Sequence, residues 1–114
     1  MATTNVVKPI ALTNIDSSTL SASYQAINAS GLTFPCFEVI INNASNQDVT
    51  ISLDGTHDHF YVVKATTLLI ASQTNSRPNN FVADFAQGTI FYAKGTAGTG
   101  NIYLSGLYQP TEHL

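Results

Sequence analysis

One six-residue stretch of this 114-residue chain gathers metal-ligating and acid–base side chains, and it reads Asp54-Gly55-Thr56-His57-Asp58-His59. In an extended chain its two histidines would point to the same side and, with a carboxylate, could hold one divalent ion. A zinc site needs three or four ligands at defined spacing, and a glycine directly after the first aspartate breaks the calcium-loop pattern. We therefore predict a turn in which the first aspartate caps backbone amides, with histidines that bond locally or face a neighbouring subunit. We predict no metal and no other cofactor; the only candidate ligands are Asp54, His57, Asp58 and His59.

A glycine-rich stretch, Gly95-Thr96-Ala97-Gly98-Thr99-Gly100, is the other motif that suggests a ligand. A phosphate-binding loop opens onto a helix and ends in a Lys-Ser/Thr pair. Here no lysine follows Gly100, and the runs on both sides alternate with a period of two. Such alternation, with glycines at the bend that permit positive φ, predicts an antiparallel hairpin and no phosphate site. The positions that share a face are Ile90, Tyr92 and Lys94 in the first run, and Ile102, Leu104 and Gly106 in the second.

No arrangement of residues indicates catalysis. The single cysteine, Cys36, lies among apolar neighbours, which favours a buried, inert thiol over a nucleophile. There is no nucleophile-elbow pattern for a serine hydrolase. A carboxylate pair for glycoside hydrolysis would have to come from residues that mostly fit turns or solvent faces of strands. These are Glu38, Asp48, Asp54, Asp58 and Asp84. We predict that the chain is not an enzyme, and a small metal-dependent enzyme around His57 and His59 ranks last among the functions considered.

The unusual feature of the composition is its low charge. Charged residues make up 10% of the chain, against about 25% in ordinary soluble domains. The four basic residues are scattered and the net charge is -3, so the basic patch of a nucleic-acid-binding protein is missing. The polar surface must come from 39 Ser, Thr, Asn and Gln residues. With few charges to repel neighbours, such a surface suits a subunit packed against others; a secreted-type β-domain with a Thr/Asn-rich exterior is the alternative.

The length predicts one domain whose core needs neither disulfide nor metal. We expect an N-terminal arm or edge strand over residues 1–14, a β-domain over 15–108 and a tail over 109–114. No signal-peptide pattern and no apolar stretch of membrane-spanning length is visible, so we expect a soluble protein made in the cytoplasm. Because Pro9 is excluded from a central strand, we expect the arm to be ordered mainly by pairing with the sheet edge of another subunit.

Almost every segment has the pattern of a strand. Predicted strands cover residues 20–26, 37–41, 49–53, 60–63 and 66–70 and both arms of the hairpin, with residues 81–85 a strand or a helical turn. Bends are predicted at Asp54–Gly55 and near residues 64–65, and loops at 42–48 and 72–80. We predict an all-β, single-domain antiparallel β-sandwich, or a small barrel, of seven to eight strands. The predicted core is Leu20, Tyr24, Phe37, Val39, Ile41, Val49, Ile51, Leu53, Phe60, Val62, Leu69, Ile90, Tyr92, Ile102 and Leu104.

Three stretches carry a family resemblance: IDSSTLSASYQAI, VTISLDGTHDHFYV and GTIFYAKGTAGTGNIYLSGLY. They resemble small virion structural proteins of tailed bacteriophages, which commonly combine an Asp-Gly turn and a following Asp with a late Lys-Gly-x-x-Gly-x-Gly hairpin and an aromatic end. The resemblance extends from Ile15 to Tyr108. It implies a virion component, either a capsid decoration protein or a head–tail connector in the neck. Its partners would be other virion proteins and copies of itself in a homo-oligomer, with no nucleic acid and no membrane.

A second function stays open on the residues alone. The chain has six phenylalanines and five tyrosines, and these aromatic side chains could form a platform on which sugars stack. They could equally be ordinary sheet-packing residues, since strands favour aromatic side chains. The alternative prediction is therefore a carbohydrate- or cell-surface-binding β-module. The tyrosines are Tyr24, Tyr61, Tyr92, Tyr103 and Tyr108.

Overall fold

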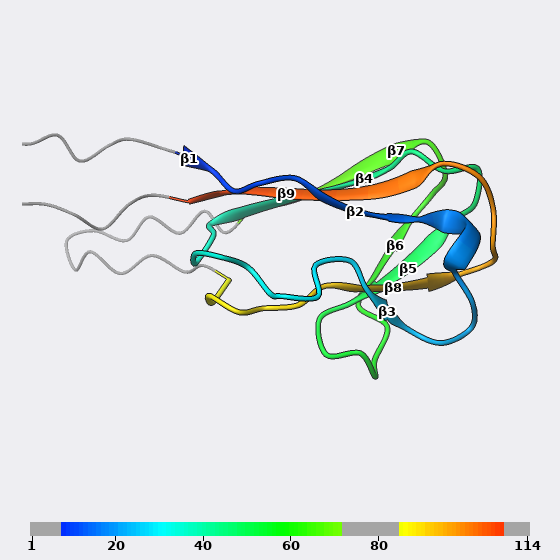
Figure 1. Cartoon of the computed structure of the whole chain (residues 1–114), viewed down its shortest axis with the longest axis horizontal. Helices are drawn as coiled ribbons and strands as arrows, with labels where there is room; N and C mark the ends of the chain where they lie inside the picture. The colour runs from blue at the N-terminus through cyan, green and yellow to red at the C-terminus, as the bar shows by residue number, and fades with distance from the viewer. Residues whose placement is uncertain (1–7, 72–84, 109–114) are drawn as a thin grey trace, which may run out of the picture.

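The computed structural model describes residues 8–71 and 85–108, which form nine β-strands, one 3-10 turn and no α-helix (Figure 1). The strands are β1 (Lys8–Pro9), β2 (Thr13–Asp16), β3 (Gln25–Ala26), β4 (Glu38–Asn43), β5 (Val49–Ser52), β6 (Phe60–Val62), β7 (Thr66–Ala71), β8 (Tyr92–Gly95) and β9 (Asn101–Tyr108). The 3-10 turn η1 (Ser17–Thr19) follows β2. The predicted all-β sandwich is confirmed, with one or two more strands than expected.

Two antiparallel sheets make the two layers. Sheet A has the order β1-β9-β4-β7, with β2 also paired to β9, and sheet B has the order β3-β8-β5-β6. Figure 1 shows sheet A above sheet B, with β2 and β3 at edges of their sheets. Consecutive strands lie in different sheets, except β1 and β2, which both belong to sheet A, and β5 and β6, which both belong to sheet B.

The core lies between the sheets, where alternate residues of each strand point inward. In sheet A the register places Ile41 of β4 opposite Leu104 of β9, and both side chains are fully buried. In sheet B Ile51 lies opposite Ala93, and both are fully buried. The buried apolar residues are Leu20, Ile27, Leu32, Cys36, Val39, Ile41, Val49, Ile51, Val62, Phe91, Ala93, Ile102 and Leu104.

The predicted hairpin around residues 95–100 is wrong. Strand β8 pairs with β3 and β5 in sheet B, whereas β9 pairs with β1, β2 and β4 in sheet A. The glycine-rich connection therefore crosses between sheets. Two strands of one hairpin and two strands of facing sheets have the same period of two, so alternation alone cannot separate these arrangements. The inward face of the first run was also assigned wrongly, because Phe91 and Ala93 are buried while Ile90 and Tyr92 are half-buried.

Other predicted elements need smaller corrections. The strand predicted over residues 20–26 is reduced to β3, because Asp16 caps the 3-10 turn by accepting from the Ser18 amide at 2.9 Å and the chain then leaves the sheet. Leu69 was predicted in the core but is 56% exposed, since Leu68 and Ile70 supply the inward face of β7. Four more predicted core residues are half-buried: Tyr24, Phe37, Leu53 and Phe60.

Several local predictions hold. Asp54–Gly55 lies in the bend between β5 and β6, which pair with Val49 opposite Val62. The two short strands predicted on either side of residues 64–65 are β6 and β7. The segments 1–7, 72–84 and 109–114 lie outside the described residues, and with them the predicted loop over 72–80, most of the segment 81–85 and the C-terminal tail.

Residues 8–16 form one of the two edges of sheet A, and β7 forms the other. From Lys8 onward it pairs with β9 of the same chain, so the expectation that a second subunit orders this part of the arm is wrong. Ile10 donates to the Gly106 carbonyl at 3.0 Å, and Thr13 lies opposite Leu104. Residues 11 and 12 therefore both oppose residue 105, which is a β-bulge. The bulge lets Ile10 and Thr13 both face the interior and turns Leu12 outward, where it is 61% exposed.

Candidate functional site

The loop of residues 53–59, between β5 and β6, holds the four candidate metal ligands. The Asp54 carboxylate accepts hydrogen bonds from the amides of His57 and Thr56, both at 2.8 Å, and from the Ser52 hydroxyl at 2.9 Å. Its second oxygen lies 2.8 Å from Nδ1 of His57. These hydrogen bonds, led by the one from the His57 amide, hold the pKa of Asp54 well below its usual range. As interpreted from the sequence, Asp54 caps the turn.

The side chains of the other three candidate ligands each contact different partners. His59 accepts a hydrogen bond from the Leu53 amide at Nδ1, 3.0 Å away, and its ring centre lies 6.4 Å from that of His57. Asp58 contacts the Tyr24 hydroxyl and lies 3.1 Å from Nζ of Lys94. Within residues 8–71 and 85–108, no three or more His, Cys, Asp or Glu side chains come together in a way that could hold a metal ion. The geometry favours a loop-building role for all four.

The depressed pKa of Asp54 predicts acid sensitivity of this loop. The folded carboxyl stays ionised at a pH where the unfolded one is protonated, so its contribution to stability is complete at neutral pH. That contribution should be lost as the pH falls below about 4. Asp54→Asn keeps an oxygen acceptor but no charge, and should lose less stability between neutral and acid pH than the unaltered chain.

Urea unfolding midpoints measured at several pH values check this. Glu38→Gln, which removes the same charge outside the loop, serves as the control. Asp48 and Asp58 also have lowered pKa values, so some acid sensitivity should remain in the Asp54→Asn variant. Equal pH profiles for the unaltered chain and Asp54→Asn would contradict the role of Asp54.

The outer face of sheet B is polar and already partnered. Nζ of Lys94 lies 4.7 Å from the centre of the Tyr24 ring, and Asp58 contacts both side chains. Burial and the hydrogen bond to Asp58 raise the pKa of Tyr24 to about 12. On the same sheet Tyr61 donates to Asp48 at 2.7 Å, which lowers the pKa of that carboxyl. The charged side chains described on this face are therefore bonded to other protein groups and do not point together toward a ligand-binding site.

The amides of the glycine-rich connection are also engaged. Gly95 donates to the Ser21 carbonyl at 2.9 Å and Gly98 to the Ser17 carbonyl at 3.1 Å. The Thr99 amide donates to the Asn46 side chain at 2.9 Å. A phosphate would need these same N–H groups. Of the three glycines only Gly100 has positive φ (95°), so the predicted turn conformation holds at that position, while close packing explains the other two.

The remaining catalytic candidates do not converge either. The Cys36 side chain is fully buried, and its sulfur lies 3.4 Å from the Phe34 carbonyl oxygen. Glu38 stands on β4 in sheet A, whereas Asp48 belongs to the loop before β5 and the carboxylates of the 53–59 loop lie beyond that strand. Asp84 lies outside the described residues.

The outer face of sheet A carries an uncharged surface that was not predicted from the sequence. An open hollow of about 270 Å³ is lined by Leu12, Ile40, Asn42, Tyr103 and Ser105. The register extends this surface across the sheet by placing Leu69 beside Ile40. Two features of the structure made it unpredictable. One is the bulge that turns Leu12 outward, and the other is that Leu68 and Ile70 of β7 face the core, which turns Leu69 outward. The surface is defined by Leu12, Ile40, Asn42, Leu69, Tyr103 and Ser105, and is called the sheet-A patch below.

Among the described residues there is no helix of the length and apolar character needed to cross a membrane. A scan against protein-family models, a search of curated proteins and a search of solved structures find no match to this chain. The resemblance to phage virion proteins therefore stays a prediction from the sequence.

Proposed function

We propose that this chain is a structural subunit of a bacteriophage virion. It assembles by protein–protein contacts with copies of itself and with other virion proteins, on the capsid or in the head–tail neck, and performs no catalysis. The observation that supports the proposal is the sheet-A patch, an uncharged surface where Leu12 is 61% and Leu69 is 56% exposed.

The chemistry of the patch suits assembly better than ligand capture. Its side chains are aliphatic, one tyrosine and short neutral polar groups, with no charge inside its boundary. Protein interfaces are depleted of charge at their centre and enriched in tyrosine, and contiguous exposed apolar surface commonly marks an interaction site. The nearest charged residues on these strands, Asp16 and Glu38, stand at strand ends on the same face, so charge borders the patch and is absent from its centre.

The test places a charge in the patch. Leu69→Lys should weaken self-assembly or particle attachment at least about tenfold, because burying an unpaired ammonium group is costly. Its side chain is already exposed, so the fold should be kept. Val63→Lys is the matched control: Val63 is 47% exposed but lies between β6 and β7, outside the patch. Light scattering after gel filtration measures the oligomer, and cryo-microscopy of phage particles that contain the chain locates it. Unaltered assembly of Leu69→Lys, or a chain that never enters particles, would refute the proposal.

A carbohydrate- or cell-surface-binding module is the second candidate, favoured by one feature of sheet B. The Tyr61 side chain is 63% exposed beside the Asp48 carboxylate, as in a platform where a sugar ring stacks. Against it, the hydroxyl of Tyr61 and both oxygens of Asp48 are already hydrogen-bonded within the protein. A stable monomer that binds glycans on an array, and loses binding in Tyr61→Ala, would favour this candidate over assembly.

A further inference from the structure

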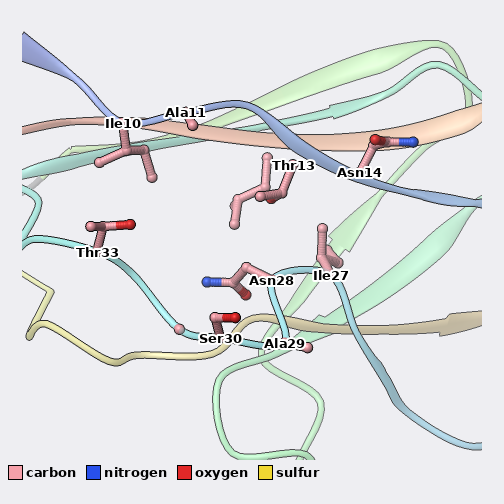
Figure 2. A pocket seen from close by; sticks show the side chains of 11 residues that line it. Ile10, Ala11, Thr13, Asn14, Ile27, Asn28, Ala29, Ser30 and Thr33 are labelled. Atoms are coloured by element: carbon pink, nitrogen blue, oxygen red, sulfur yellow. The ribbon is translucent and has the colours of Figure 1, made fainter.

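A groove opens along the side of the sandwich where both sheets end. One wall is the edge segment Ile10–Asn14 of sheet A, and the other is the segment from Ile27 to Thr33, which follows β3 of sheet B. Figure 2 shows Ile10 and Thr13 facing Asn28 and Ser30 across the opening. The groove has a volume of about 420 Å³, and none of the residues that line it is charged.

One buried polar atom of a residue that lines the groove has no partner. The Thr13 hydroxyl oxygen is buried and has no hydrogen-bond partner in the part of the chain that the structure describes. A buried polar atom in that state is costly unless an occupant satisfies it. The Asn28 amide on the facing wall is not available, since it donates to the Thr89 carbonyl at 3.0 Å and accepts from the Phe91 amide at 2.8 Å.

On this side β2 also pairs with no other strand that the structure describes. Ser17 donates to Gly100 at 2.9 Å, in register with β2 and β9. Alternation along an antiparallel pair then directs the backbone groups of Thr13 and Ile15 toward β9 and those of Asn14 away from it. An edge of this kind accepts an added strand, which supplies main-chain hydrogen bonds while its side chains fill the groove.

We propose that this groove takes residues 2–7 of a second copy of the chain as an added strand. The inference rests on the proposed function, for which it names the contact between subunits. The segment reads Ala-Thr-Thr-Asn-Val-Val, and it is uncharged, free of proline and rich in β-branched residues. Six extended residues span about 20 Å, enough to cover the five-residue wall from Ile10 to Asn14.

The composition and the path of the chain both favour this occupant. The other terminal segment, residues 109–114, contains Pro110, which cannot donate to an edge, and Glu112, whose charge the uncharged groove would have to bury. The N-terminal segment leads into Lys8, which pairs with Tyr108 while the chain runs on toward Ile10. To enter its own groove it would have to reverse direction immediately before Lys8, and residues 2–7 contain no glycine for a tight turn. A neighbouring copy needs no such reversal.

The test removes the segment and supplies it again. A chain that begins at Lys8 keeps every strand described here, so it should stay folded but show at least about tenfold weaker self-association. A synthetic peptide of residues 2–7 should bind this shortened chain and protect the Asn14 amide from hydrogen exchange. Thr13→Val should weaken that binding about fivefold, the effect of one lost hydrogen bond. Thr56→Val, in the exposed 53–59 loop, should leave it unchanged.

Each outcome decides between the two proposals. If the shortened chain self-associates as well as the full one, or if the peptide does not bind, this inference is wrong while the proposed function is untouched. A full chain that is monomeric at all concentrations, with a protected Asn14 amide, would mean that the segment occupies its own groove, which also overturns the inference. If the segment drives self-association of a chain that never enters phage particles, the inference stands and the proposed function fails.

Discussion

Replacing Asn43 by alanine is expected to lower the free energy of unfolding by about 4 kcal/mol, which few single substitutions in a small domain exceed. Asn43 is the last residue of β4, and its side chain is fully buried. Its Nδ2 donates to the carbonyls of Gln47 at 2.8 Å and Val62 at 3.1 Å. Its oxygen accepts from the amide of Ser45 at 3.1 Å and from its hydroxyl at 2.6 Å. One amide thus ties β4 and the following loop to the end of β6.

The neighbouring asparagine gives a matched control on the same strand. Asn42 is exposed on the outer face of sheet A, so Asn42→Ala should change the unfolding free energy of the monomer by no more than about 0.5 kcal/mol. Urea unfolding followed by circular dichroism measures both variants. Equal losses would mean that the loss at Asn43 reflects strand propensity at this end of β4 and not the buried network.

Asn43 also illustrates what could not be predicted from the sequence. The run after Ile41 reads Asn-Asn-Ala-Ser-Asn-Gln, and by composition it was predicted to be a loop. The structure continues β4 through its first two residues. The partner that makes burial of Asn43 tolerable, the Val62 carbonyl, comes from a strand 19 residues later, and no local pattern encodes that meeting. Asparagine at such a position gives the same sequence signal as asparagine in a solvated turn.

The predictions that succeeded depend on neighbours in the chain. Period-two alternation located β5, the apolar runs that follow were correctly predicted as β6 and β7, and the Asp-Gly pair located the bend after β5. The role of Asp54 as a cap was also predictable, because its partners Thr56 and His57 are two and three residues away. These contacts are fixed by local backbone geometry, which the residue types report directly.

The assignment of strands to sheets depends on contacts between distant segments. The alternation of β8 and β9 is equally compatible with a hairpin and with a crossover. What distinguishes the two is the packing of the connection on residues 44–47, which are distant in the sequence. The sheet-A patch and the groove both depend on the bulge at residues 11 and 12. These residues include no glycine, so the sequence does not indicate a bulge there. Neither candidate interaction surface could therefore be predicted from the sequence.

Replacing Gly100 by alanine is expected to lower the free energy of unfolding by about 4 kcal/mol, from backbone strain and overpacking together. Gly100 has a φ of 95°, and a Cβ atom there would lie 2.5 Å from the Ala44 carbonyl oxygen and 2.9 Å from Cα of Ser45. Both neighbours are backbone atoms of the loop after β4, so neither can move aside without disturbing that loop.

Gly88→Ala separates the two contributions. Gly88 has a similar φ of 89°, but a Cβ atom there would meet nothing within 4 Å. This variant should therefore lose only the strain, about 1 kcal/mol. Thermal or urea unfolding of both variants gives the difference. A clearly larger loss at Gly100 would mean that the crossover between the sheets requires glycine mainly for close approach to the loop after β4. Equal losses would mean that positive φ alone explains this glycine, and that the 96–100 connection does not pack on that loop as described.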